Sequence, residues 1–430
     1  MTDKILTVRM DAYPSDSHKL HRYVGTGGYE ALRKALTEMS RDEIVEEVKV
    51  SNMRGRGGAG FPTGVKWGFL APSEPRYLVI NCDESEPGTF NDRQLTERDP
   101  HQLLEGIVIS SYALGVNHAF VYIRGEYPKA ARRMQSAVEE AYEAGYLGED
   151  ILGSGFSLDV TLHLGGGAYI CGEETALLNS LEGRRGEPRL KPPFPAIEGL
   201  YGKPTIVNNV ESISNIPWIT VNGGAAYAAI GPERSAGTKM LSISGHVKEP
   251  GNYEIVMGMT WRELIYEIGG GIRDDRALKA WIPGGASAPW FVPDEHLDTL
   301  VTIEDVAANG SMIGAGAVVV MDETTNVVAA AHRIVRFFAH ESCGQCTPCR
   351  EGTFWLEAVL KRILNGGGRP EDIDLLLSIS DNISPGLVWP PAMTTICPLG
   401  PSAVSPVTSI TRWFRPEIEA MISMREVAVV

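Results

Sequence analysis

Blocks of apolar and polar residues alternate along the first half of the chain. Apolar stretches at 76–82 and 119–124 are typical of strands buried in a parallel sheet, and a third strand is expected at 157–164. Helices are expected between them, over about 100–114 and 128–144. Because strands alternate with helices, the pattern predicts an α/β fold with a doubly wound sheet.

The segment before the first strand predicts less regular structure. Residues 1 to about 40 are expected to form an irregular lead-in that ends in a short amphipathic helix from Tyr29. A second helix is expected after Ser40, because Ser40 is a good N-cap and Glu43 stands three residues later. This helix leads into a glycine-rich loop.

The pattern changes after about residue 238, where shorter strands predict a small β-grasp-like domain. Its expected elements are a hairpin at 239–245 and 251–257, a helix at 260–268 and strands near 280–282 and 317–321.

From about residue 324 the pattern is helical, and four helices imply a bundle. They are expected at 326–341, 350–365, 370–383 and 403–424. The predicted domains are therefore 1–237, 238–323 and 324–430.

Length and composition narrow the class of protein. The chain has 430 residues, more than one core usually covers, so two or three domains are expected. A net charge of -15 argues against nucleic acid or an anionic membrane as the main partner, because both require a basic face. Six cysteines are too few for a disulfide scaffold and fit a reducing compartment. The N-terminus shows no secretory or organellar address.

Three closely spaced cysteines carry the strongest chemical signal. Cys343, Cys346 and Cys349 follow a Cys-x-x-Cys-x-x-Cys pattern, and Cys397 can supply a fourth thiolate, so a 4Fe-4S cluster is predicted. Zinc or a disulfide is the alternative. Structural zinc sites, however, usually combine two closely spaced Cys-x-x-Cys or Cys/His ligand pairs, and no second pair stands near Cys397.

Cys397 lies in an uncharged run at 382–411. Prolines interrupt the run, so it is not expected to span a membrane. An uncharged wrapping would shield a cluster from water, whereas the alternative is a proline-rich surface loop.

The first glycine loop satisfies G-x-G-x-x-G through Gly55, Gly57 and Gly60, but it follows a helix rather than the strand that a Rossmann fingerprint needs. Glycines let backbone N–H groups approach a phosphate or a flat ring, and Arg56 and Lys66 add positive charge. Ligand binding and a plain loop both remain open for this motif alone.

An acidic turn follows the first predicted strand. Asp83, Glu84 and Glu86 stand where open α/β sheets bind ligands, which favours a ligand site over a solvated turn.

A second glycine loop joins the third predicted strand to a helix. Glu173 and Glu174 stand where this helix starts and are expected to accept hydrogen bonds from ribose hydroxyls. Phe194, in a stiff loop with Lys191, could stack on a base, although a helix staple or a surface loop is the alternative. Asn208 and Asn209 offer two amides to a polar ring edge.

Four motifs together resemble the NADH-binding flavoprotein subunit of respiratory complex I, an NADH-quinone oxidoreductase, over nearly the whole chain. They are residues 55–67, 83–88, 168–175 and 341–352. The resemblance implies FMN in a Rossmann-like domain with NADH stacked on it, a ubiquitin-like domain and a helical domain with one 4Fe-4S cluster. No general acid or nucleophile is required.

The resemblance also implies roles for individual residues. FMN would be held by Gly55, Gly57, Lys66, Asn81, Asp83, Tyr169, Asn208 and Asn209. NADH would face Phe61, Phe69, Glu84, Glu86, Glu174, Lys191 and Phe194. Further cofactor-binding candidates in the same motifs are Arg56, Gly58, Gly60, Gly64, Ser85, Gly167, Gly172 and Glu173, and the metal ligands would be Cys343, Cys346, Cys349 and Cys397.

The implied partners are a 2Fe-2S thioredoxin-like subunit and a larger iron-sulfur subunit of a peripheral arm. The implied location is the cytoplasmic side of a bacterial inner membrane, or the mitochondrial matrix if a transit peptide has been removed. A diaphorase subunit of an NAD-linked hydrogenase or formate dehydrogenase is the alternative function, and a scaffold without cofactors is a rival of another class. The sequence departs from the family where Cys397 is followed by Pro398, Leu399, Gly400 and Pro401.

Overall fold

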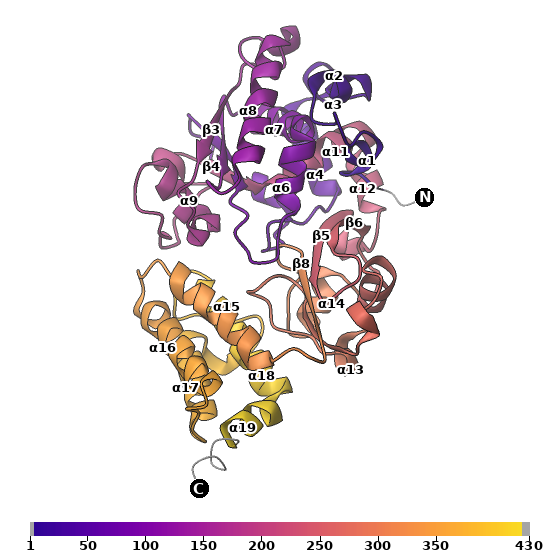
Figure 1. Cartoon of the computed structure of the whole chain (residues 1–430). Coiled ribbons are helices and arrows are strands. Elements are labelled where there is room, and N and C mark those ends of the chain that lie inside the picture. The colour runs from indigo at the N-terminus through magenta and orange to yellow at the C-terminus, as the bar shows by residue number, and fades with distance from the viewer. Residues whose placement is uncertain (1–3, 424–430) are drawn as a thin grey trace. The chain divides into compact units, whose positions relative to one another are not determined.

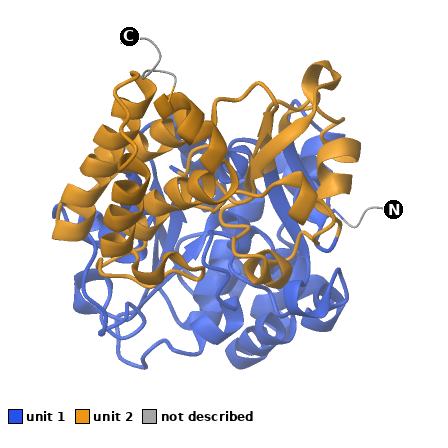
Figure 2. Cartoon of the chain, turned by 90° about the horizontal axis from the view of Figure 1, so that it is seen from below, with its two compact units in different colours: residues 1–85, 89–241, 252–258 blue, residues 86–88, 242–251, 259–430 orange. Residues whose placement is uncertain are grey.

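The structure is a computed structural model that describes residues 4–423 (Figure 1). It contains two compact units, which Figure 2 colours blue and orange. Unit 1 comprises the residues up to Ser85, Thr89–Leu241 and Asn252–Gly258, and unit 2 comprises Glu86–Gly88, Ser242–Gly251 and the residues from Met259 onward.

Unit 1 contains a four-stranded parallel sheet with the order β3-β2-β1-β4. Its strands are β1 Tyr77–Cys82, β2 His118–Ile123, β3 Asp159–Leu164 and β4 Thr205–Asn209. The three predicted strands are present and the mixed α/β class is confirmed, while β4 was not expected as a strand. Because all four strands are parallel, their carboxyl ends share one edge, where open α/β sheets bind ligands.

The helices between these strands include α6 Asn91–Arg98, α7 Pro100–Leu114, α8 Pro128–Glu143 and α9 Glu174–Leu181. The helices expected near 100–114 and 128–144 are confirmed. All residues of α7 except Tyr112 are buried, including the polar residues His101, Gln102 and Glu105. α8 has a polar outer face and buries a stripe that includes Ala130, Met134 and Val138.

The N-terminal region contains the short helices α1 Val8–Ala12, α2 Leu20–Gly25, α3 Glu30–Glu38 and α4 Arg41–Val50. The helix expected from Tyr29 is confirmed as α3, but the segment before it is not irregular throughout, because it contains α1 and α2. The buried Glu254 carboxylate accepts hydrogen bonds from the backbone N–H groups of Ile5, Leu6 and Thr7 at 2.8–3.0 Å, which anchors the segment before α1. The start of α4 is as predicted, with a full capping box between Ser40 and Glu43.

Four short helices complete unit 1: α5 Thr63–Trp67, α10 Val210–Ser214, α11 Ile216–Asn222 and α12 Gly224–Ala228. α5 follows the first glycine loop, and α10 begins where β4 ends.

A second sheet has the strand order β6-β5-β8-β7. Its strands are β5 Thr238–Gly245, β6 Gly251–Val256, β7 Leu278–Ile282 and β8 Ala317–Asp322. β8 pairs in parallel with β5 and antiparallel with β7. The strands expected here are confirmed, whereas the helix expected at 260–268 contains a π-helical segment, Glu263–Ile268. The short helices α13 Pro293–His296 and α14 Ile303–Ala308 lie between β7 and β8 in sequence.

The C-terminal part of unit 2 is helical (Figure 1). Its helices share a core that includes Val335, Leu356, Leu376 and Val407. The helices are α15 Val327–Glu341, α16 Thr347–Leu364, α17 Asp372–Ile383, α18 Leu399–Trp413 and α19 Arg415–Ser423.

The single helix expected at 403–424 is two helices, and residue 424 lies outside the described residues. α18 ends at Trp413, and Pro416 lies in the first turn of α19, where a backbone N–H has no partner within the helix and a proline is tolerated. Among residues 4–423, none of the helices has the length and apolar character needed to cross a membrane.

Candidate functional site

The first glycine loop is a closed turn between α4 and α5. An antiparallel bridge joins Arg54 to Pro62, and the Gly55 N–H donates to the Phe61 carbonyl at 2.8 Å. Gly58 and Gly60 have positive φ angles of 129° and 64°, which side-chain-bearing residues rarely adopt. The loop therefore depends on its glycines for its conformation.

The Arg56 side chain does not add positive charge to an exposed face of this loop, contrary to expectation. It is buried, and its guanidinium donates to the Tyr227 hydroxyl at 3.2 Å and to the Ala236 carbonyl at 2.7 Å. The Arg56 side chain thus anchors the loop to the rest of unit 1.

Four predicted charged residues meet in one cluster, although they come from three separate segments. The Lys66 ammonium donates to Glu174 at 2.9 Å and to the Val207 carbonyl at 2.8 Å. Lys191 donates to Glu173 at 2.9 Å and to Glu174 at 3.3 Å. Burial opposes ionisation of Glu174, but Lys66 and Lys191 outweigh it and lower the Glu174 pKa. The Glu174 carboxylate is therefore paired with both lysines, which favour its ionised form.

Glu173 also has a structural task that its predicted ribose contact did not include. Its carboxylate accepts from the backbone N–H groups of Thr175 at 2.8 Å and Ala176 at 3.0 Å, so it caps the N-terminus of α9. This cap fixes the start of the helix that carries Glu174.

The predicted amides lie at the carboxyl ends of β1 and β4. Asn81 donates to the Gly172 carbonyl at 2.8 Å and accepts from the Asp83 N–H at 3.0 Å. Asn208 accepts from the Trp67 indole N–H at 2.9 Å. These bonds join the sheet edge to α5 and to the second glycine loop.

The remaining polar and glycine candidates of unit 1 lie in the same loops. The Ser85 hydroxyl donates to Asp83. Tyr169 and Gly172 begin and end a 3-10 turn before α9. Gly167 has a φ of 87°, and Gly64 packs so closely that an added Cβ would lie 2.5 Å from the Lys49 backbone nitrogen.

Three predicted aromatic rings are exposed on unit 1. Phe61, Phe69 and Phe194 are 48%, 57% and 57% exposed, and the rings of Phe61 and Phe69 have centroids 6.2 Å apart. Large exposed aromatic side chains close together are typical of surfaces that bind a ligand or a partner. Their flat faces are suited to stacking on a planar ring.

Glu84 does not present its carboxylate to solvent, contrary to the expected contact with NADH. It is buried and accepts from the backbone N–H groups of Asp92 at 2.8 Å and Arg93 at 2.9 Å, so it caps α6. The Tyr127 hydroxyl donates to the same carboxylate at 3.1 Å. Burial raises the pKa of Glu84 to about 7, despite these hydrogen bonds.

Glu86 belongs to unit 2, where its carboxylate accepts from both the backbone N–H and the hydroxyl of Ser287 at 2.7 Å. The acidic turn is therefore not a solvated turn. Its glutamates are bound to the protein.

The cysteine triplet lies between α15 and α16, and Cys349 is in the first turn of α16. Cys349 and Cys397 are buried, and the Ser342 hydroxyl lies 3.2 Å from the Cys349 sulfur. Burial, together with the neighbouring Cys346 and Cys343 thiols, raises the pKa of Cys349 to about 11. Cys343 and Cys346 thus lie close enough to Cys349 to act on its pKa.

Four cysteines are the donor set that a 4Fe-4S cluster requires. Within the described residues, no three histidine, cysteine, aspartate or glutamate side chains are arranged to hold one metal ion. In a 4Fe-4S cluster each cysteine binds a different iron, so the thiolates are spread around the cluster rather than gathered on one ion.

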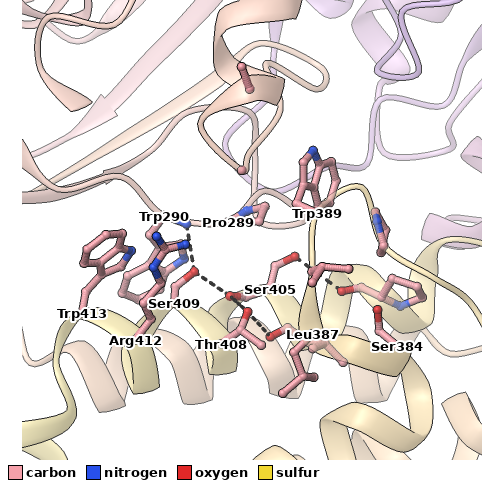
Figure 3. A pocket seen from close by; sticks show the side chains of 16 residues that line it. Pro289, Trp290, Ser384, Leu387, Trp389, Ser405, Thr408, Ser409, Arg412 and Trp413 are labelled. Atoms are coloured by element: carbon pink, nitrogen blue, oxygen red, sulfur yellow. Dashed lines mark hydrogen bonds between the residues drawn. The ribbon is translucent and has the colours of Figure 1, made fainter. Parts of the chain in front are cut away.

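A pocket of about 330 Å³ lies beside the segment that leads to Cys397 (Figure 3). Its lining includes Trp290, Trp389 and Trp413 together with Arg412 and the hydroxyls of α18. None of its sixteen lining residues is one of the predicted site residues.

Comparisons with known proteins agree with the motifs. The sequence matches the Nuo51 FMN-binding domain over residues 48–218, the SLBB domain over 239–320 and the NADH-ubiquinone oxidoreductase-F iron-sulfur binding region over 329–421.

Similar proteins extend over most of the chain. An F-type subunit, numbered 2, of the NADH-quinone oxidoreductase of Rhizobium meliloti (strain 1021) is 52% identical over 95% of this chain and 96% of its own length. The F-type subunit of the NADH-quinone oxidoreductase of Streptomyces coelicolor is 51% identical over 98% of this chain and 93% of its own length. Among solved structures, a chain of an NAD+-reducing NiFe hydrogenase in its H2-reduced state superposes with a TM-score of 0.83 at 33% identity, covering 96% of this chain and 70% of that one.

The raised pKa of Glu84 predicts a specific pH dependence of stability. Between the unfolded value near 4.5 and the folded value of about 7, the folded state binds the proton and the unfolded state does not, so this group's stabilisation is lost as pH rises. We expect Glu84→Gln to remove on the order of 1–3 kcal/mol of this decline in the free energy of unfolding between pH 5 and 7. Urea unfolding at several pH values measures it.

Glu97→Gln, on the helix α6 that Glu84 caps, is the matched control. Arg93 and Lys129 outweigh burial and lower the pKa of Glu97, so its pH dependence falls below pH 5. The prediction would be contradicted if the free energy of unfolding declined equally between pH 5 and 7 in the wild type and in Glu84→Gln.

Proposed function

The chain belongs to the family of F-type subunits of NADH-quinone oxidoreductase, and we propose that it is the electron-input subunit of such an enzyme. It oxidises NADH at FMN and passes electrons singly to a 4Fe-4S cluster and then to partner subunits. The cluster of Lys66, Glu173, Glu174 and Lys191 is the observation that carries the proposal, because it joins both predicted glycine-loop regions in one place.

When bound, FMN would supply the chemistry that links a two-electron hydride donor to a one-electron acceptor. The protein binds and orients the flavin. We assign this task to the backbone of Gly55–Gly60, to Lys66, and to the loop groups at the sheet edge. The latter are Asn81, Asp83, Ser85, Gly167, Tyr169, Gly172, Asn208 and Asn209.

We assign NADH binding to the exposed rings of Phe61, Phe69 and Phe194 and to the charges of Glu174 and Lys191. The rings offer flat surfaces for stacking. Glu174 accepts hydrogen bonds and would repel an added 2'-phosphate. Glu84 contributes indirectly, since its carboxylate caps α6.

Cys343, Cys346, Cys349 and Cys397 are the proposed cluster ligands. Three belong to one loop and its following helix turn, and the fourth stands immediately before α18. The burial of Cys349 and Cys397 and the uncharged run around Cys397 fit a cluster shielded from water.

At a finer level, the three proposed domains are Rossmann-like, ubiquitin-like and helical. The order β3-β2-β1-β4 supports the first, and the match to the SLBB domain supports a separate second domain. The proposed partners are a 2Fe-2S thioredoxin-like subunit and a larger iron-sulfur subunit, and the proposed place is a peripheral arm on the cytoplasmic or matrix side of the membrane.

The hydrogenase alternative is supported by the 33% identical solved structure, which is a chain of an NAD+-reducing hydrogenase. The relatives at 51–52% identity favour the quinone-linked role. Purification from cells with the partner subunits separates the two, because copurification with hydrogenase subunits would select the alternative.

The activity itself gives the first test of this function. FMN-loaded protein is expected to show flavin bleaching when NADH is added without oxygen, and to reduce an artificial acceptor. An absorbance spectrum taken beforehand separates an enzyme from a colourless scaffold. No bleaching by NADH would overturn the proposal.

Nucleotide preference tests Glu174. Replacing Glu174 with Gln removes the charge that would repel a 2'-phosphate, so the preference for NADH over NADPH is expected to narrow about tenfold. The measurement is the ratio of kcat/KM for the two nucleotides. Glu182→Gln, at a largely enclosed carboxylate that follows the C-terminal end of the same helix, is the control, and an unchanged ratio for Glu174→Gln would exclude Glu174 as the discriminator.

The cysteine assignment separates flavin reduction from cluster reduction. Cys397→Ser is expected to abolish or alter the 4Fe-4S signal in electron paramagnetic resonance while NADH still bleaches the flavin in stopped-flow absorbance. Cys82→Ser, at a buried cysteine of β1, is the matched control and should keep the cluster signal. An unchanged signal in Cys397→Ser would show that Cys397 is not a ligand.

A further inference from the structure

The amide of Asn209 is held in one orientation by two helices. Its Nδ2 donates to the Asp92 carboxyl of α6 at 2.5 Å, and its Oδ1 accepts from the Ser212 N–H of α10 at 3.2 Å. Both ends of the amide are thereby engaged. The remaining freedom of the Asn209 side chain is small.

Asn209 in turn packs directly against the first glycine loop. A Cβ added at Gly57 would lie only 2.9 Å from the Asn209 Cβ, so the loop backbone and this side chain are in close contact. The preceding residue is held as well, because the Arg56 N–H donates to the Ser212 hydroxyl at 2.9 Å. A change in the position of Asn209 would therefore move the loop.

Asp92 is buried and is held on both sides. Its second oxygen accepts from the Glu211 N–H at 3.2 Å, while its own backbone N–H donates to Glu84. Glu211 is paired with Lys239 at 2.5 Å, and the Lys239 ammonium also donates to the Arg56 carbonyl at 3.2 Å. Asp92 thus stands in a buried network that reaches the glycine loop by two routes.

We propose that Asp92 is a positioning residue for flavin binding, which holds the Asn209 amide, and through it the loop at Gly57, in the binding arrangement. The inference rests on the proposed function, because Asn209 and Gly57 are assigned there to FMN. Asp92 itself is not assigned a contact with the cofactor.

The charges of the network support this role. Glu84, Asp92 and Glu211 are three buried carboxyl groups, and the Lys239 ammonium is bound among them. Such burial is costly for folding, and proteins retain it most often at functional sites. Burial, followed by the nearby Glu84 and Glu211 carboxyl groups, raises the pKa of Asp92.

The test uses the full chain, freed of FMN, and follows flavin fluorescence during rebinding. Asp92→Asn keeps the shape but replaces one of two acceptor oxygens with a donor, so one contact is lost. We expect the Kd for FMN to rise about tenfold, as for an unsatisfied buried group. Glu97→Gln, on the same helix but bound to Arg93 and Lys129, should leave the Kd unchanged.

A double-mutant cycle separates positioning from general support of the fold. In an Asn209→Ala background, Asp92→Asn should cause no further loss, because the group that it orients is gone. The exchange Asp92→Asn with Asn209→Asp restores a donor and an acceptor across the contact, and it should bind FMN more tightly than Asp92→Asn alone. If Asp92→Asn alone folds poorly, the exchanged pair still allows the proposal to be tested by FMN binding.

The inference would be overturned if Asp92→Asn weakened FMN binding equally in the wild-type and Asn209→Ala backgrounds, or did not weaken it at all. Either result would leave the proposed function intact. A wild-type chain that binds no FMN would overturn both. The midpoint potential of the flavin is a second readout, since a displaced amide should shift it and the Glu97→Gln control should not.

Discussion

The buried ion pair between Lys239 and Glu211 is the interaction on which the arrangement of unit 1 depends. Its atoms lie 2.5 Å apart, and both side chains are almost fully enclosed. Glu211 also accepts from the Met240 N–H at 2.8 Å and from the Asn91 amide at 3.0 Å, so it joins α10, β5 and α6. The Lys239 ammonium also donates a hydrogen bond to the Arg56 carbonyl, which links the ion pair to the first glycine loop. Loss of one partner of such a pair costs roughly 3–5 kcal/mol, because the other charge is left buried alone.

Around this pair, the candidate site is assembled from groups that are already satisfied by one another. Lys66 and Lys191 are neutralised by Glu174 and Glu173 before any ligand arrives. A charged ligand that binds there has to replace these ion pairs with contacts of equal strength. Its affinity will therefore depend on the difference in free energy between the contacts it makes and the ion pairs it breaks, and not on attraction to unpaired positive charges. The exposed phenylalanines contribute without such an exchange.

Much of the fold follows from local sequence, whereas the direction of individual side chains does not. The buried strands β1 and β2 are continuous apolar runs, and the capping box of α4 needs only residues three apart. β4 could not be predicted in this way, because it has only five residues and ends in two asparagines. The structure of the N-terminal segment could not be predicted from local sequence either, because Glu254, which anchors it, is more than 240 residues away in the chain.

The candidate site shows the same division. Glycine spacing and the cysteine triplet identify which segments carry chemistry, and the family resemblance is confirmed by the comparisons. The pairing of Lys66 with Glu174 spans 108 positions and requires the fold. Arg56 and Glu84 carry charges that suggested solvent or ligand, but both point inward, since a turn's sequence does not reveal which of its faces is covered.

The anchoring of the N-terminal segment by Glu254 gives the beginning of the chain an unusual status. The backbone N–H groups of Ile5, Leu6 and Thr7, together with the Thr238 hydroxyl, are the donors that compensate this buried carboxylate. Trimming these residues would leave a desolvated anion in the interior, so the damage would arise in the core of the protein rather than at its edge. Residues 5–7 are therefore, in energetic terms, an internal part of unit 1.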